Sequence, residues 1–240
     1  MCVAIYKPKR VNLPSLEILK QCWDANPDGA GFAMLTGGER AIEIHKGYMT
    51  WKQFVTAHEK YHLAEFNGDL LLHFRIATHG GISPGNTHPF CITKDVKLLQ
   101  HTNVLSNNAL IHNGILPIEP EVKGISDTME LCRRLAEGGL SRNIPAVFNL
   151  IQGMAGNNKI AVMTREKVHL FGDWESVEGV YFSNLLWNWP IDDDLNFITT
   201  RKELSQLNRG YCPYCNGEVE KDDELFYCLE CGEVWMKQAK

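Results

Sequence analysis

Four cysteines near the carboxyl end constrain the folding of this sequence more than any other feature. They form two CxxC pairs, CPYC and CLEC, with twelve residues between the pairs. Each CxxC places two sulfurs on one tight turn, and two such turns close a tetrahedral site of four thiolates. Tetrahedral sulfur ligation favours Zn²⁺ over iron, and this spacing favours a metal over two disulfides or redox-active dithiols. The expected ligands of a closed, structural zinc site are Cys212, Cys215, Cys228 and Cys231.

The segment that holds these cysteines is acidic, which restricts its partners. Residues 211–240 contain three lysines and seven acidic residues, a net charge of −4. Binding of nucleic acid depends largely on neutralising phosphates with lysine and arginine, so we do not expect nucleic acid as a partner. A protein partner, or packing on the rest of the chain, fits this charge better.

The composition of the whole chain is that of an ordinary globular protein. Its 240 residues are 44% hydrophobic and 22% charged, with a net charge of −5. This length suffices for one sizeable domain and a small appendage. No apolar run reaches the roughly 18–20 residues of a membrane span, and early basic residues interrupt any export signal. We therefore expect a cytoplasmic protein without membrane contact, in which Cys22, Cys91 and Cys132 are buried free thiols.

Hydrophobic periodicity predicts strands followed by helices and further strands, which indicates the α+β class. Side-chain caps at Ser15, Thr50 and Ser126 predict three helices, through SLEILKQCWDAN, WKQFVTAHEKYH and DTMELCRRLAE, and IPAVFNLIQ predicts a fourth. Predicted strands include CVAIY, FAML, AIEIH, DLLLHFRIAT and GVYFSN, a pair formed by KLLQHTN and ALIHNGIL, and a hairpin formed by KIAVMT and VHLFGD.

The amino-acid composition changes after residue 185, which indicates domain boundaries. LLWNWPIDDDLN mixes aromatic residues, proline and three aspartates, as a linker or a domain edge does. We expect a main domain at 1–190, a linker at 191–210 and the cysteine module at 211–240.

The second residue is a cysteine, Cys2, which is small enough for Met1 to be removed during processing. Its thiol could then attack a carbonyl group while its own α-amine, with a pKa near 8, accepts the proton. Many proteins carry a small residue at this position, so the position alone does not establish catalysis.

Four further residues have the chemistry that amide hydrolysis requires. Asn113 and Gly114 could donate hydrogen bonds to an oxyanion, although Asn-Gly is also a common hairpin turn. Arg75, at the end of an apolar strand, could bind a carboxylate or form a structural salt bridge. Asp127, in the first turn of a predicted helix, could bind an ammonium group or stabilise the helix end.

Six short motifs occur in an order that resembles one family. MC, DGAGFA, HFRIATHG, NTHPF, IHNG and SDT, within residues 2–185, are similar to motifs of the class II glutamine amidotransferases, which are N-terminal-nucleophile hydrolases. The chain departs from the family at Val3, where the family usually has glycine. The resemblance implies a four-layer αββα sandwich. It also implies Cys2 as nucleophile, its α-amine as base, Asn113 and Gly114 as oxyanion hole, and substrate contacts from Arg75 and Asp127, with Thr78, His79 and His88 shaping loops at the pocket.

The resemblance implies a glutaminase that forms a glutamyl thioester and releases ammonia. Only about fifty residues follow the amidase region, less than half of a typical domain, so we expect a separate ammonia-accepting enzyme as partner. Two alternatives remain at this stage. The same scaffold could hydrolyse another amide, such as a γ-glutamyl or modified-peptide bond, or it could be a non-catalytic scaffold protein.

Overall fold

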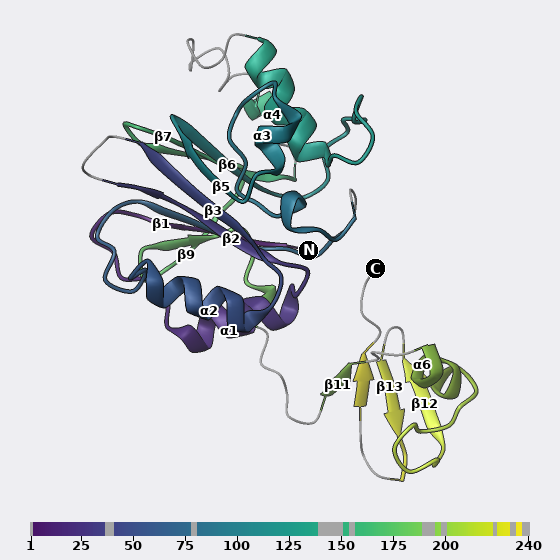
Figure 1. Ribbon diagram of the computed structural model, residues 1–240. Helices are drawn as coiled ribbons and strands as arrows, with labels where there is room; N and C mark the ends of the chain where they lie inside the picture. Colours follow the sequence, from purple (N-terminus) through teal and green to yellow (C-terminus); the bar gives the residue numbers. More distant parts are fainter. Residues whose placement is uncertain are drawn as a thin grey trace. The chain divides into compact units, whose positions relative to one another are not determined.

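The computed structural model describes residues 2–36, 41–77, 81–138, 151–153, 157–188, 195–197, 201–222, 225–230 and 234–236. The chain divides into two compact units, residues 1–188 and residues 189–240 (Figure 1). Among the helices of these described stretches, none is long and apolar enough to cross a membrane.

The larger unit contains an antiparallel sheet of seven strands, in the order β5-β3-β2-β4-β1-β10-β9. All five residues of the central strand β4 are buried, as the apolar run LLLHF predicts. The strands span Val3–Lys7 (β1), Ala30–Leu35 (β2), Ile42–Tyr48 (β3), Leu70–Phe74 (β4), Asn103–Ser106 (β5), Glu175–Val177 (β9) and Val180–Phe182 (β10).

Helices α1 (Leu16–Ala25) and α2 (Trp51–Lys60) cover one face of this sheet (Figure 1). Their predicted caps are confirmed, because Ser15 accepts a hydrogen bond from Ile18 N–H and Thr50 forms a capping box with Gln53. The apolar residues of both helices join the buried strand residues in one core, in which Trp23 and Phe54 contact the ring of Phe74.

A second antiparallel sheet, β6-β7-β8, faces the other side of the first. Its strands are β6 (Asn108–Asn113), β7 (Lys159–Thr164) and β8 (Val168–Phe171), so the predicted hairpin of β7 and β8 is confirmed. A core that includes Ala4, Leu71, Ile111 and Met163 lies between the two sheets.

Helices α3 (Val96–Gln100) and α4 (Asp127–Glu137) lie on the outer face of this second sheet (Figure 1). Met129, Cys132 and Leu135 of α4 pack in one core with Leu110 and Ile160 of the sheet. The predicted cap of α4 is confirmed, because Ser126 Oγ accepts a hydrogen bond from Met129 N–H at 3.2 Å. Of the predicted helix IPAVFNLIQ, residues 151–152 are helical and the remainder lies outside the described residues.

Three predictions of secondary structure differ from the structure. KLLQ was expected in a strand but belongs to α3, because Asp95 caps this short helix and Leu99 is buried on its inner side. The following strand β5 does not pair with β6, since β5 joins β3 in the first sheet and β6 joins β7 in the second. The helix predicted through residue 62 ends at Lys60, and His62 has a φ of 49°.

In the described residues of the smaller unit there is a four-stranded sheet, in the order β11-β14-β13-β12, and one helix, α6 (Arg201–Asn208). Its core consists of Leu207, Cys212, Phe226, Cys228 and Trp235. The segment 191–210, expected as a linker, thus contains α6 and the strand β11, which pairs with β14. The strands span Leu195–Phe197 (β11), Val219–Asp222 (β12), Leu225–Cys228 (β13) and Val234–Met236 (β14).

Candidate active site

Cys2 lies directly before β1 and beside the chain that leaves β4. Its Sγ lies 3.4 Å from Ile76 N, which donates to it, and 3.4 Å from Ile76 O. Burial raises the pKa of the thiol, and the hydrogen bond from Ile76 and the charge of Arg75 only partly oppose this effect. Cys2 therefore carries a proton at neutral pH, and its use as a nucleophile requires a base. Val3, where the family resemblance has glycine, is buried in the ladder opposite Phe74.

Arg75 follows β4 and is 4% exposed. Its backbone N–H donates to Gly29 O at 2.8 Å, and its guanidinium Nη1 donates to Gly81 O at 2.9 Å. Burial lowers the pKa of Arg75, whereas the nearby Cys2, Asp28 and Asp127 raise it. Arg75 therefore lies close enough to Cys2, Asp28 and Asp127 for their charges to interact. Thr78 and His79 lie outside the described residues.

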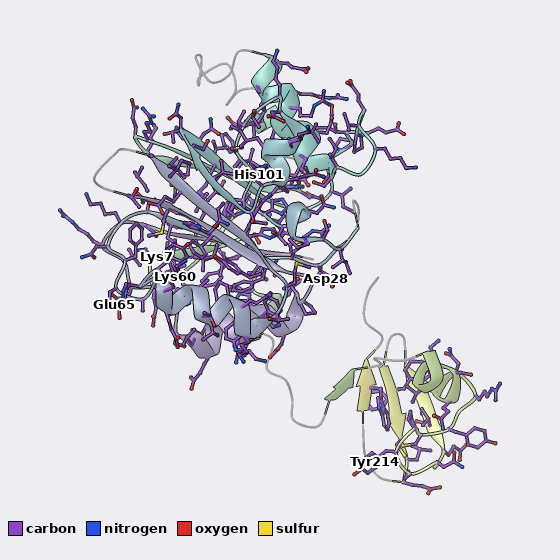
Figure 2. All side chains as sticks on the ribbon, in the orientation of Figure 1. Lys7, Asp28, Lys60, Glu65, His101 and Tyr214 are labelled. Carbon is purple, nitrogen blue, oxygen red and sulfur yellow. The ribbon has the colours of Figure 1, made fainter. Side chains whose placement is uncertain are left out.

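Asp28, labelled in Figure 2, holds the backbone around Ile76 in place. Its N–H donates to Arg75 O at 2.9 Å, and its Oδ2 accepts from Ala77 N–H at 2.8 Å. These two hydrogen bonds of Asp28 lie on either side of Ile76, the residue that contacts the Cys2 sulfur. Sequence reasoning did not single it out, although it begins the motif DGAGFA, because its partners Arg75 and Ala77 lie after β4, far from it in the sequence.

Asn113 and Gly114 lie at the end of β6, in the second sheet. Asn113 is 3% exposed, and its Nδ2 lies 3.0 Å from Ser183 Oγ, which in turn accepts a hydrogen bond from Ala4 N–H at 2.9 Å. These contacts bring the end of β6 next to β1, two residues from Cys2. Gly114 has a φ of 138°, and a Cβ atom there would lie 2.0 Å from Asn158 Oδ1, so a side chain does not fit.

Asp127 is the first residue of α4, but it is not the cap of that helix. The N-cap is Ser126, while the Asp127 carboxylate accepts hydrogen bonds from Leu116 N–H at 2.9 Å and from Thr128 N–H at 2.7 Å. A carboxylate oxygen can accept more than one hydrogen bond, so Asp127 Oδ2, which accepts from Leu116 N–H, retains capacity for a ligand ammonium group. The contact with Leu116 also fixes the loop that follows Gly114.

His88 belongs to a buried cluster of histidines behind these residues. The rings of His73 and His88 stack with 4.1 Å between centroids, and a His73 ring nitrogen lies 2.9 Å from His112 O. Burial, the largest cause, lowers the pKa of His88 well below its usual value and that of His73 to about 3. Both rings are therefore neutral at neutral pH, and the described contacts give His88 a packing role.

Three of the four clustered cysteines lie together in the smaller unit. The Sγ atoms of Cys212, Cys215 and Cys228 are all within 4.8 Å of one another, and Cys231 lies outside the described residues. The 3.5 Å between the sulfurs of Cys215 and Cys228 is too long for a disulfide. Backbone N–H groups of Tyr214 (Figure 2) and Cys215 donate to Cys212 Sγ at 3.2 and 3.3 Å, which suits a thiolate. The three thiols could hold a metal ion.

Comparisons with known proteins give limited support. No protein-family model matches the chain, and no curated protein matches it. Among solved structures, the chain is similar to glutamine phosphoribosylpyrophosphate (PRPP) amidotransferase from B. subtilis complexed with ADP and GMP, at 18% identity and a TM-score of 0.45. The match covers 78% of this chain and 42% of that one, so this chain spans less than half the length of the amidotransferase.

Proposed function

We propose that the chain is a glutamine-hydrolysing module of the class II amidotransferase type. The observation that carries the proposal is the convergence of groups from different elements around Cys2. The charge of Arg75, after β4, interacts with Cys2 and with Asp127 on α4. Asn113, at the end of β6, is linked to β1 by hydrogen bonds through Ser183. These are the residue types that a hydrolase of a free amino-acid amide requires.

The layers of the larger unit support an N-terminal-nucleophile hydrolase fold. Apolar cores lie between α1–α2 and the first sheet, between the two sheets, and between the second sheet and α3–α4. We propose that this order of layers is the four-layer αββα sandwich of that fold, with the amidase domain at 1–190 and the cysteine module at 211–240, to which the segment 191–210 contributes α6 and β11.

The proposed reaction begins once Met1 has been removed. The α-amine of Cys2 accepts the thiol proton, and the sulfur attacks the side-chain carboxamide of glutamine. Asn113 and the Gly114 N–H stabilise the oxyanion of the tetrahedral intermediate. The intermediate collapses, the protonated α-amine returns its proton to the leaving nitrogen, and ammonia departs. Water then hydrolyses the glutamyl thioester to glutamate and regenerates the thiol.

Arg75 and Asp127 favour free glutamine over an internal amide. A free amino acid presents an α-carboxylate and an α-ammonium group, which match the opposite charges of these two residues. A guanidinium can donate two parallel hydrogen bonds to a carboxylate, so Arg75 is suited to bind the substrate α-carboxylate. An amide inside a peptide lacks both charged ends, so a modified-peptide substrate or a non-catalytic scaffold leaves the pair without a role in recognition. A γ-glutamyl substrate presents the same two charged ends as glutamine.

The experiment that tests the proposal is intact-mass measurement before and after treatment with a diazo-ketone analogue of norleucine, an electrophile that mimics glutamine. We expect the purified protein to lack Met1 and to gain a single adduct that maps to Cys2. Cys2→Ala protein is the control and should gain none. A processed protein that gains no adduct, or gains it at the exposed Cys215, would contradict the proposal.

We further propose that the cysteine module binds one structural Zn²⁺ through Cys212, Cys215, Cys228 and Cys231, and that the module contacts a separate ammonia-accepting enzyme. Zinc in such a site contributes directly to folding, because the unfolded segment lacks a preformed site. Tetrahedral thiolate ligation also supplies no open position for catalysis.

Cys215→Ser is expected to release the zinc and to unfold the smaller unit while the larger unit stays folded. Metal analysis of the wild-type protein should find one zinc per chain. Cys22→Ser is the matched control, because Cys22 is a buried thiol in the core of the larger unit, and it should keep the metal. Full zinc content in Cys215→Ser protein would rule out this site.

A further inference from the structure

Ser183 lies immediately after β10, where β1, the strand that follows Cys2, meets the second sheet. The side chain is buried, with 1% exposure of the residue. Its backbone N–H donates to Ala4 O at 2.9 Å, and its Oγ accepts from Ala4 N–H at the same distance. The next residue, Asn184, donates through Nδ2 to Cys2 O at 2.8 Å. Ser183 therefore forms hydrogen bonds with both backbone groups of Ala4, in strand β1.

The same hydroxyl meets Asn113, which belongs to the other sheet. Asn113 Nδ2 lies 3.0 Å from Ser183 Oγ, although the two residues are 70 positions apart in the sequence. One buried oxygen atom therefore connects the strand of the nucleophile with the proposed oxyanion donor.

When the Asn113 amide nitrogen faces Ser183 Oγ, this oxygen is surrounded by hydrogen-bond donors and has no acceptor for its own hydrogen among the described residues. Ser183 Oγ then receives hydrogens from Ala4 N–H and Asn113 Nδ2, with Asn184 Nδ2 at 3.5 Å as a third donor. No described residue accepts the hydroxyl's own hydrogen, and the buried Asn113 Oδ1 has no hydrogen-bond partner. A buried carbonyl oxygen without a partner costs free energy of folding.

A half-turn of the Asn113 amide about its Cβ–Cγ bond removes both defects. The nitrogen and oxygen exchange places, and hydrogen-bond networks decide which orientation an asparagine adopts. Ser183 O–H then donates to Asn113 Oδ1, while Ala4 N–H still donates to Ser183 Oγ. The Asn113 nitrogen now occupies the position that has no protein acceptor, and its hydrogens are available to a ligand.

We propose that Ser183 is a positioning residue, whose hydroxyl orients the Asn113 amide so that its nitrogen donates to the oxyanion formed from glutamine. This role rests on the proposed glutaminase function. Ser183 does not itself contact the substrate. The role accounts for a buried hydroxyl group at the place where the two sheets meet. It also predicts that Ser183 acts on the reaction through Asn113 and not through Cys2.

The test compares glutaminase kinetics with alkylation of Cys2 by iodoacetamide, followed by peptide mass spectrometry. Alkylation requires the thiol and its base but forms no oxyanion. Ser183→Ala should lower kcat for glutamine about 10- to 100-fold, with little change in KM, because an unpaired buried amide loses its preferred orientation. The rate of Cys2 alkylation should stay within about twofold of wild type. Ser183→Thr keeps the hydroxyl and should recover most of kcat.

A double-mutant cycle with Asn113→Ala decides whether the two residues act as a unit. Once Asn113 is alanine, Ser183→Ala should lower kcat no further. Independent, additive losses would overturn the role, as would an alkylation rate that falls in parallel with kcat or an unchanged kcat in Ser183→Ala protein. If processed wild-type protein does not hydrolyse glutamine at all, the proposed function itself fails, and this role fails with it.

Discussion

Replacement of Cys2 by alanine is expected to abolish glutamine hydrolysis, with a loss of at least about 10⁴-fold in kcat, as for other covalent nucleophiles. Cys2 is the thiol that interacts with both Ile76 and Arg75, and the other described thiols of the larger unit, Cys22, Cys91 and Cys132, are buried away from solvent. Burial raises the pKa of the Cys2 thiol, so attack depends on removal of its proton by the freed α-amine.

This dependence has a signature in the pH profile. The unprotonated amine is the active form, so kcat/KM for glutamine should rise with pH through a pKa near 8, the usual value for an α-amino group. A steady-state ammonia-release assay between about pH 6 and 9 measures it. A profile that is flat across this range would contradict the amine as base.

A processing variant separates the amine from the thiol. Insertion of a lysine between Met1 and Cys2 prevents removal of Met1, leaves the thiol in the chain and blocks the amine. This variant should be as inactive as Cys2→Ala protein. Substantial activity with Met1 retained, checked by intact mass, would show that another group serves as base.

The sequence predicts the local features of this molecule well. The three helices whose starts were predicted from Ser15, Thr50 and Ser126 form there, because a side-chain cap and the apolar spacing behind it are encoded within a few residues. The short helix at 96–100 was missed because its pattern of apolar residues is equally that of a strand.

Contacts between distant segments were not predictable in the same way. The segments KLLQHTN and ALIHNGIL do not predict that β5 and β6 join different sheets, because the sheet of each strand is decided by its partner, β3 for β5 and β7 for β6. Ser183 gave no local signal, because its importance arises only when Ala4 and Asn113 meet it. Asp28 belongs to the motif DGAGFA, but its hydrogen bond with Ala77 N–H joins residues 49 positions apart, so the motif did not predict it.

Arg75→Gln is expected to lower kcat/KM for glutamine by about 100- to 1,000-fold, mainly through KM. The fold-change corresponds to roughly 3–4 kcal/mol, at the lower end of what is lost when one partner of a buried ion pair is removed. Asp127→Asn should have an effect in the same direction, because it removes the charge that faces the substrate ammonium. Steady-state kinetics with glutamine, and with a glutamine blocked at both its α-amine and its α-carboxyl group, measure the discrimination.

The blocked substrate distinguishes free glutamine from an internal amide as the natural substrate. Wild-type protein should prefer glutamine strongly, and both variants should lose this preference while the slow turnover of the blocked amide stays nearly constant. Arg133→Gln is the matched control. Arg133 pairs with the buried Glu130 at 2.7 Å on α4, so its loss should lower the melting temperature without raising KM. If wild-type protein instead turned over the blocked amide faster than glutamine, Arg75 and Asp127 would be structural charges, and the enzyme would act on an amide within a peptide.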